Sequence, residues 1–262
     1  MIKNEISKLL KIKALYISIA IGLVSCLTGL ISYYDTAFWS YGAGLSKEIS
    51  AYNAWLDCLS IGTSAYRLIL PLIIVPFMDS YYLERKSGYQ NYLLSRTSRK
   101  KYFFSKWFIG ILSATMIVFI VLATTFAICA VLFPLNPPLP EMSHVDRNFG
   151  LDFYLENPMS YILLLILSNT FFAVIYYTVG FSLSNSIRNR YVLLLTPFIV
   201  FIIQLLVWQL FRLTYASPLI FIAFYEVKEL TPVGMMITGL IYLLIAIGML
   251  LYAYVKDTKD LA

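Results

Sequence analysis

Long apolar runs alternate with short polar connections along the whole 262-residue chain. A helix that crosses a bilayer needs about 20 predominantly apolar residues, and six runs meet that length. They cover residues 14–33, 66–83, 107–133, 159–183, 191–211 and 235–255. The pattern therefore predicts an all-α polytopic membrane protein with six transmembrane helices.

The composition agrees with this pattern and leaves no room for a soluble domain. Hydrophobic residues make up 60% of the chain, charged residues only 13%, and the mean hydropathy is +0.77. Soluble globular domains carry about 25% charged residues. We therefore expect residues 1–262 to form a single transmembrane domain, a multi-pass protein of the cytoplasmic membrane of a bacterial cell.

The first apolar run has two interpretations. Residues 23–26 match the pattern at which bacterial lipoproteins are cut, so the run resembles a secretory signal. The apolar stretch nevertheless continues past Cys26 and exceeds the length of about 7–15 residues that is usual in a signal peptide. We therefore expect an uncleaved first transmembrane helix.

The segment before this run, residues 1–13, has an amphipathic pattern. Ile2, Ile6, Leu9 and Leu10 fall near one side of a helix, with lysines elsewhere on it. This arrangement predicts an interfacial helix that leads into the first span. An alternative, compatible with it, is that the lysines only anchor the first span.

Basic residues decide the orientation in the membrane. With the N-terminus in the cytoplasm, 15 of the 20 Lys and Arg residues lie inside and nine of the 14 acidic residues lie outside. The positive-inside rule then predicts that both termini are cytoplasmic. The net charge of +6 lies next to anionic lipid head groups, so it does not indicate a nucleic-acid partner. The outer basic residues are Lys47, Arg67, Arg147, Arg212 and Lys228.

Side chains suited to catalysis or metal binding are scarce. The chain has one histidine, His144, and no HExxH or Ser/His/Asp pattern. Cys26, Cys58 and Cys129 are widely separated and indicate neither a disulfide framework nor a metal site. A GxxxxGK[ST] phosphate-binding loop is also missing, so an ATP-driven protein would need another chain to bind ATP and Mg²⁺. We expect no catalytic residue, metal or cofactor in this chain.

The outer connections differ from one another. Residues 34–65 are rich in aromatics and are expected to lie partly on the outer surface as an amphipathic segment. Residues 133–158 carry five prolines, which predicts an ordered cap without long helices. Residues 211–234 are unusually apolar and are expected to form half-helices that dip into the outer leaflet, covered by protein. Within the second span, Pro71 and Pro76 predict kinks.

Uncharged polar residues occur inside two spans. Ser168, Asn169 and Thr170 fall near the middle of the fourth span, and Gln204 lies inside the fifth. Such groups usually bond a neighbouring helix, and they are also candidates for lining a cargo path. Charged residues are nearly absent from the hydrophobic centres. Because gradient-driven transporters commonly keep an ionisable residue near the midplane, this mechanism is disfavoured.

The connection between the second and third spans, residues 83–107, holds seven basic residues in 25 positions. Within it, residues 89–94 have the length of about one and a half helical turns, and Tyr89, Leu93 and Leu94 can form an apolar ridge. Ser98 can cap the next helix. Two interpretations stay open: a basic turn that rests on lipid head groups, or a short helix that another protein covers.

The same connection resembles a known motif. Type-2 ATP-binding cassette (ABC) permeases carry, between spans two and three, a segment that reads roughly E-x-x-x-G-T, L-L, P-x-S-R and a later Lys. Six spans with both ends inside and an apolar last outer connection are similar to that family along the whole chain. The chain differs where Tyr89 replaces Thr and Arg96 replaces Pro. The matching residues are Glu84, Gly88, Leu93, Leu94, Ser98, Arg99 and Lys106.

The resemblance implies a coupling helix over residues 84–97 that docks into a cleft of a separate ATPase subunit, with residues 1–13 packed beside it. Glu84 and Gly88 would fix its shape, and Tyr89 would contact the ATPase. The further residues implied in this docking are Leu93, Leu94, Arg96 and Arg99.

The resemblance also implies a function for the whole chain. It would be one half of an exporter, paired with an identical or related permease, that moves an amphipathic cargo such as an antimicrobial peptide or drug outward. A lipid or lipid-linked glycan is the alternative cargo. A membrane receptor or assembly factor without transport is the alternative from another class, and it would need no ATPase docking helix.

Overall fold

The computed structural model describes most of the chain. The described residues are 2–41, 50–60, 62–138, 145, 150–184, 186–187, 189–212, 217–226 and 231–259. Lys47, His144, Arg147, Arg188 and Lys228 lie outside these residues, as do the side chains of Ile2, Lys3 and Lys259.

Six helical segments are long and apolar enough to cross a membrane, and the described part of the chain contains no strand. The predicted class, an all-α polytopic membrane protein, is therefore confirmed. The six spans are Lys13–Asp35, Tyr66–Lys86, Arg99–Leu132, Pro158–Leu183, Arg190–Phe211 and Pro232–Asp257.

These spans belong to a longer series of helices. Five of the spans lie within single helices: α2 (Lys13–Tyr41), α7 (Arg99–Leu132), α9 (Pro158–Leu183), α10 (Arg190–Phe211) and α12 (Pro232–Lys259). The shorter elements are α1 (Ile2–Lys11), α3 (Ala51–Asp57), α4 (Tyr66–Ile73), α5 (Met78–Lys86), α6 (Tyr89–Leu94), α8 (Leu151–Glu156), α11 (Leu219–Ile222) and the 3-10 turn η5 (Phe224–Glu226).

The second span is broken into α4 and α5. The helix stops after Ile73 and resumes at Met78, and Pro76 lies in the gap. Proline lacks an N–H and its ring clashes with the preceding turn, which explains the break. Pro71, in contrast, lies inside α4. The break thus divides the second span into α4 and α5, and α5 leads to α6.

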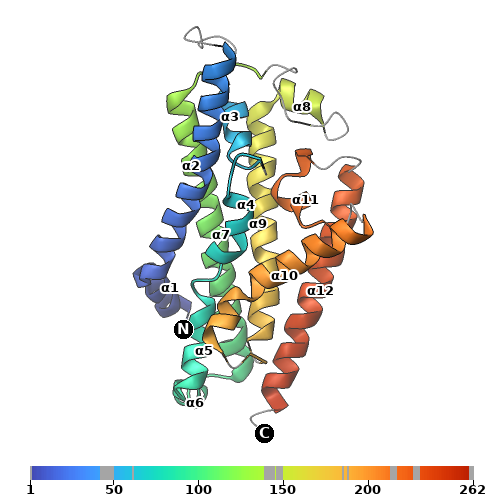
Figure 1. Cartoon of the computed structure of the whole chain (residues 1–262). Helices are drawn as coiled ribbons and strands as arrows, with labels where there is room; N and C mark the ends of the chain where they lie inside the picture. The colour runs from blue at the N-terminus through green and yellow to red at the C-terminus, as the bar shows by residue number, and fades with distance from the viewer. Residues whose placement is uncertain are drawn as a thin grey trace.

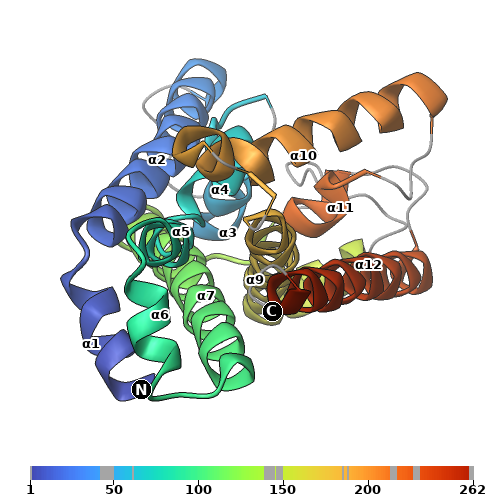
Figure 2. The same cartoon turned by 90° about the horizontal axis from the view of Figure 1, so that it is seen from below.

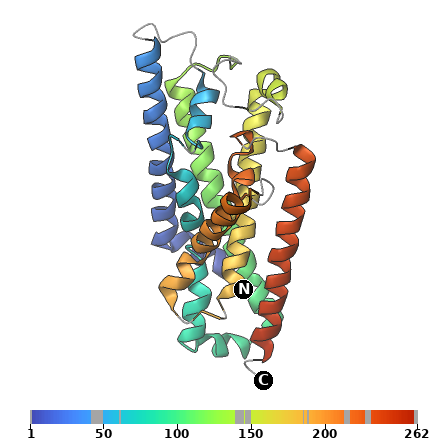
Figure 3. The same ribbon diagram turned by 45° about the vertical axis from the view of Figure 1, so that its right-hand side comes forward.

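α7 and α9 lie side by side at the centre of the bundle, with α2 against α7 and α12 against α9 (Figures 1 and 2). α10 crosses the other spans obliquely (Figure 1). The chain begins and ends toward the same end of the molecule, where α6 also lies (Figure 3). Because the basic residues gather at this end, we expect it to face the cytoplasm, and we call it the cytoplasmic end.

α7 extends beyond the predicted third span. It begins at Arg99 and runs for 34 residues, about 51 Å at the usual rise per residue. The hydrocarbon core is about 30 Å thick. Its first turns, with the exposed Lys100 and Lys101, therefore continue the helix out of the membrane on the cytoplasmic side.

Within residues 34–65, which were expected to lie partly on the outer surface, the α3 segment is instead buried in the bundle. Trp55 is completely buried, and its indole Nε1 donates to the carbonyl of Leu122 in α7 at 3.1 Å. The Tyr154 hydroxyl from α8 donates to Asn53 Oδ1 at 2.7 Å. The aromatic residues of α3 thus face protein, where their polar tips find partners.

The apolar segment after α10 also enters the bundle. Residues 219–225 of α11 and η5 are all buried, and α11 packs on α9. This agrees with the expected insertion of residues 211–234, although one short helix and a 3-10 turn take the place of two half-helices. We name α3, α11 and η5 together the outer insert.

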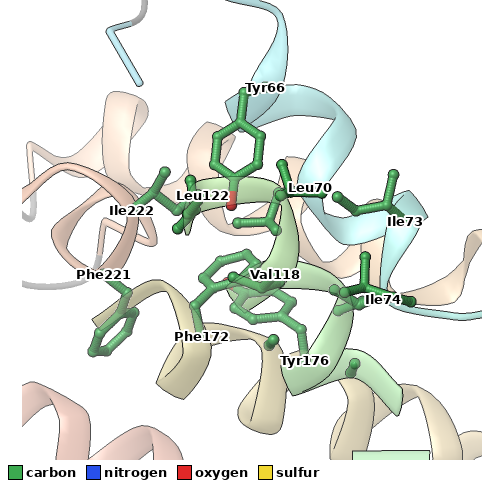
Figure 4. Packing of buried hydrophobic residues seen from close by; sticks show 14 of the residues in the cluster. Tyr66, Leu70, Ile73, Ile74, Val118, Leu122, Phe172, Tyr176, Phe221 and Ile222 are labelled. Atoms are coloured by element: carbon green, nitrogen blue, oxygen red, sulfur yellow. The ribbon is translucent and has the colours of Figure 1, made fainter. Parts of the chain in front are cut away.

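Buried residues of the outer insert belong to the main hydrophobic core. Figure 4 shows the part where α11 meets α4, α7 and α9 through apolar and aromatic side chains. Labelled examples are Tyr66, Leu70, Ile73 and Ile74 of α4 and its C-cap, Val118 and Leu122 of α7, Phe172 and Tyr176 of α9, and Phe221 and Ile222 of α11.

Candidate functional site

α6 begins after a single residue in the left-handed conformation. Gly88 has a φ of 74°, a backbone angle that residues other than glycine rarely adopt. A Cβ atom at this position would meet nothing within 4 Å, so the backbone conformation and not the space requires glycine. α6 covers the residues predicted to form the short helix, whereas Glu84 belongs to the preceding α5.

The exposed face of α6 differs from the predicted ridge. Tyr89 and Tyr92 are 45% and 51% exposed, whereas Leu93 and Leu94 are partly buried against the core. The two tyrosine rings stack with centroids 5.8 Å apart, and the Arg96 guanidinium lies 4.7 Å from the Tyr92 ring centroid. The outward surface is therefore aromatic and cationic. Because α6 has only six residues, its sequence pattern does not show which side faces outward. The predicted ridge therefore did not include Tyr92.

A cluster of charged side chains holds α5, the helix that leads into α6, against α1 and α7. We call this end of α5 the base of α6. Lys106 of α7 is completely buried, and its Nζ lies 2.7 Å from Glu84 Oε1 and 2.7 Å from Glu5 Oε2. The Tyr102 hydroxyl donates to Glu84 Oε2 at 2.8 Å. Lys8 lies 3.1 Å from Glu5 and 3.7 Å from Glu84. These five residues join α1, α5 and α7, and we name them the inner joint.

The charges of the inner joint balance one another. Burial by itself raises the pKa of Glu5, but the hydrogen bonds and charges of Lys106 and Lys8 outweigh it and lower that pKa below 4.5. Burial lowers the pKa of Lys8, but Glu5 and Glu84 outweigh it and raise that pKa above 10.5. Opposite charges at this distance favour the ionised forms of both partners. Glu5 and Lys8 therefore stabilise each other in their charged forms.

α5, which leads directly into α6, also contacts two further spans. Arg190 of α10 holds the Asp79 carboxylate with two nitrogens, and its Nε donates at 2.7 Å. The Tyr81 hydroxyl donates to Asp257 of α12 at 3.2 Å, and Arg85 Nη1 lies 3.9 Å from the same carboxylate. A displacement of α5 would therefore reach α1, α7, α10 and α12.

Two of the candidate cargo-path residues bind the outer insert. Ser168 Oγ donates to the Phe221 carbonyl at 2.6 Å, and Asn169 Nδ2 donates to the Ile222 carbonyl at 2.9 Å. α11 has only four residues, so its carbonyls have few partners within the helix. In a membrane such groups must be bonded internally. Ser168 and Asn169 supply these bonds.

The other two candidates make interactions within the bundle. The Thr170 hydroxyl donates to the Ile166 carbonyl of its own helix at 2.8 Å, and Gln204 accepts a hydrogen bond from the Tyr176 hydroxyl. Ser168 also lines a groove of about 500 Å³ between α9, α11 and α12, whose wall is otherwise apolar. Thr170 and Gln204 do not line this groove.

Arg67, at the start of the second span, is buried in the protein and paired with an acidic residue. Its side chain is only 3% exposed, and Nη2 lies 2.8 Å from Glu226 Oε1 of η5. Arg67 Nε donates to the Leu59 carbonyl. The sequence could not show this pair, because the two residues are 159 positions apart and meet only through the outer insert.

The three cysteines, distant in the sequence, are free and belong to one buried cluster. α2, the C-cap of α3 and α7 carry them. Among the residues that the structure describes, no group of three or more His, Cys, Asp or Glu side chains is arranged to hold a metal ion.

Comparisons with known proteins give no family model, no curated protein and no solved structure that matches this chain. A functional assignment therefore rests on the motif residues and on their geometry.

Proposed function

We propose that the chain is the membrane-spanning permease subunit of an ABC exporter, driven by ATP that a separate ATPase subunit binds and hydrolyses. One observation carries this proposal: α6 presents an exposed Tyr89–Tyr92 pair on a base that buried charges tie to α1 and α7. A turn that only rested on lipid would not need a rigid base of this kind.

The position of α6 supports docking to a protein. It lies beyond α1 at the cytoplasmic end of the molecule (Figures 1 and 3). The exposed charged side chains around it are basic: Lys86, Arg96, Lys100 and Lys101. Aromatic and Arg side chains are enriched at the centres of protein interfaces. We propose that Tyr89 and Tyr92 enter the ATPase cleft and that Arg96 and Arg99 meet its acidic rim.

The contacts of α5 suggest how ATPase closure would act on the spans. A push on α6 would move α5 as a short rigid body, because Pro76 uncouples it from α4. Asp79 would transmit the movement to α10, and Tyr81 would transmit it to α12. Glu84 would keep α6 aligned with α7 through Lys106.

The exporter would contain a second permease chain, identical or related, and the cargo would pass between the two. The cargo class proposed is an amphipathic peptide or drug. The groove of about 500 Å³ between α9, α11 and α12, apolar except at Ser168, supports a cargo with a large apolar part. A lipid or lipid-linked glycan has the same property and is the alternative.

Affinity purification of the tagged chain in mild detergent tests this proposal. We expect an ATPase with a phosphate-binding loop to co-purify in stoichiometric amount, and Tyr89→Ala to release it. Tyr252→Ala, which removes another exposed tyrosine on α12, is the matched control. A chain that purifies without an ATPase under every gentle condition would favour the receptor or assembly-factor alternative.

A further inference from the structure

A second cavity, of about 230 Å³, lies between the start of α4, the second half of α10 and α11. Most of its wall is apolar and includes Leu68, Phe201 and Leu205. Its polar residues include Arg67 and Gln209. A buried arginine in the wall of an apolar cavity within a membrane protein indicates a binding site, because an intramembrane charge is expensive to keep.

The hydrogen bonds of Arg67 are incomplete. A guanidinium has five N–H donors. Nε donates to the Leu59 carbonyl, and Nη2 forms an ion pair with Glu226 at 2.8 Å without the geometry of a hydrogen bond. No hydrogen bond of regular geometry joins Nη1 or Nη2 to a residue that the structure describes. The neighbouring Tyr225 hydroxyl gives its proton to the Leu56 carbonyl, and its oxygen interacts with the Arg67 guanidinium, which leaves further N–H donors of Arg67 without a partner among the described residues.

Glu226 balances the charge of Arg67 but leaves its donors unused, which a purely structural ion pair would not require. The planar guanidinium matches the oxygens of a phosphate or carboxylate in a two-point contact. The apolar walls suit a hydrocarbon part attached to that group.

We infer that this cavity binds the anionic group, a phosphate or carboxylate, of an amphipathic molecule, and that Arg67 is the residue that recognises it. Gln209, on the rim, offers a further amide donor. This inference does not depend on an ATPase partner or on transport.

Binding to the purified full-length chain in a neutral maltoside detergent tests the inference. The probe is dodecyl phosphate, and dodecylphosphocholine has the same tail without the net charge. We expect dodecyl phosphate to bind about tenfold more tightly, since a hydrogen bond to a charged group contributes that much or more. Equal affinity for the two probes would overturn the inference. Displacement of dodecyl phosphate by inorganic phosphate at the same concentration would show that the site binds free anions. It would overturn the inference that the ligand is amphipathic.

Three variants locate the site. Arg67→Gln is expected to abolish the preference for dodecyl phosphate, whereas Arg212→Gln, which removes a cation at the end of α10 outside the cavity wall, is expected to retain it. Equal losses in both variants would contradict a specific site.

Glu226→Gln keeps the inference testable if Arg67→Gln does not fold. It removes the carboxylate next to Arg67, so dodecyl phosphate should bind about tenfold more tightly and raise the melting temperature more than in the wild type. Unchanged or weaker binding in Glu226→Gln would contradict the assigned role of Arg67.

Discussion

The inner joint and the outer insert are both largely buried, but different interactions hold them in place. In the inner joint, Lys106 lies between two carboxylates at 2.7 Å each. In the outer insert, neutral side chains donate mainly to backbone carbonyls, as Asn169 does to Ile222 and Tyr225 does to Leu56. The Arg67–Glu226 pair is the exception.

The difference follows from where water is available. Short helices inside a bilayer leave backbone carbonyls that only protein donors can satisfy, so their bonds cannot be exchanged for water. The inner joint lies at the cytoplasmic end, where Lys8 is half exposed and charges can be rehydrated. We therefore expect the outer insert to act as a fixed frame and the inner joint to be the place where the molecule adjusts to a partner.

Removal of Lys106 should have the largest effect. Lys106→Met leaves Glu5 and Glu84 buried without their shared cation, and breaking a buried ion pair in this way costs about 3–5 kcal/mol. The free energy of unfolding, measured by reversible unfolding in mixed micelles, should fall by that amount. Lys101→Met, on the exposed side of the same helix, should change it by about 0.5 kcal/mol or less. Equal effects of the two substitutions would remove the distinction between the inner joint and the surface.

Gly29 tests how tightly the outer insert is packed. A Cβ atom at this position would lie 2.5 Å from the carbonyl oxygen of Asp57, and a backbone atom cannot move aside as a side chain does. Gly29→Ala should therefore displace α3 and lower the free energy of unfolding by about 1–3 kcal/mol. Gly248→Ala, where a Cβ would meet nothing within 4 Å, is the control and should be neutral or stabilising. A neutral Gly29→Ala would mean that α3 is not held as a fixed frame.

Asn169 tests the hydrogen bonds of the outer insert. Asn169→Leu removes the donor for the Ile222 carbonyl, and an unsatisfied buried group costs about 1–3 kcal/mol. Thr170→Val is the control, since that hydroxyl bonds only its own helix, and it should cost about 0.5 kcal/mol or less. Faster hydrogen exchange in residues 219–225 of the Asn169 variant alone would show that the lost bond frees α11. Equal exchange in both variants would contradict this role.

Acid should loosen the inner joint and leave the outer insert in place. The pKa of Glu5 is lower in the folded protein than in the unfolded chain, so its charge stabilises the folded protein above pH 4.5. This stabilisation is lost as the pH falls through the pKa of Glu5 in the folded protein. Hydrogen exchange of α1, corrected for its intrinsic pH dependence, should therefore rise below pH 4.5 while that of α11 does not. Glu5→Gln should remove this step from α1. An identical acid response in α1 and α11 would contradict the comparison.

The sequence predicted the parts of the fold that depend on local pattern. Run length predicted the six spans, and the length of residues 89–94 suited the short helix that α6 forms. The burial of α3 could not be predicted, because Trp55 suits a membrane surface as well as a protein interior until its partner Leu122 is known. The Arg67–Glu226 pair escaped prediction for the same reason: each residue alone looks like an outer-loop charge.

The candidate site was predictable in its position but not in its contacts. Glu84, Gly88 and Lys106 were singled out by the resemblance to the permease motif, and the structure joins Glu84 to Lys106 at 2.7 Å. Glu5 lies 101 positions from Lys106, so its place in the same cluster depends on how α1 returns along α7. The sequence left Ser168 and Asn169 as candidates both for helix packing and for a cargo path. Their hydrogen bonds to the backbone carbonyls of Phe221 and Ile222 depend on where α11 enters the bundle, which the sequence does not show.

A photo-crosslinking amino acid placed at Tyr92, in the cell membrane, tests the central claim most directly. The same probe at Tyr252, an exposed position on α12, serves as the control. The account predicts a crosslink from position 92 to an ATP-binding cassette ATPase, lost when Lys106→Met disrupts the base of α6, and no such crosslink from position 252. Crosslinks from position 92 to lipid alone, or to the same proteins as position 252, would contradict α6 as the docking element.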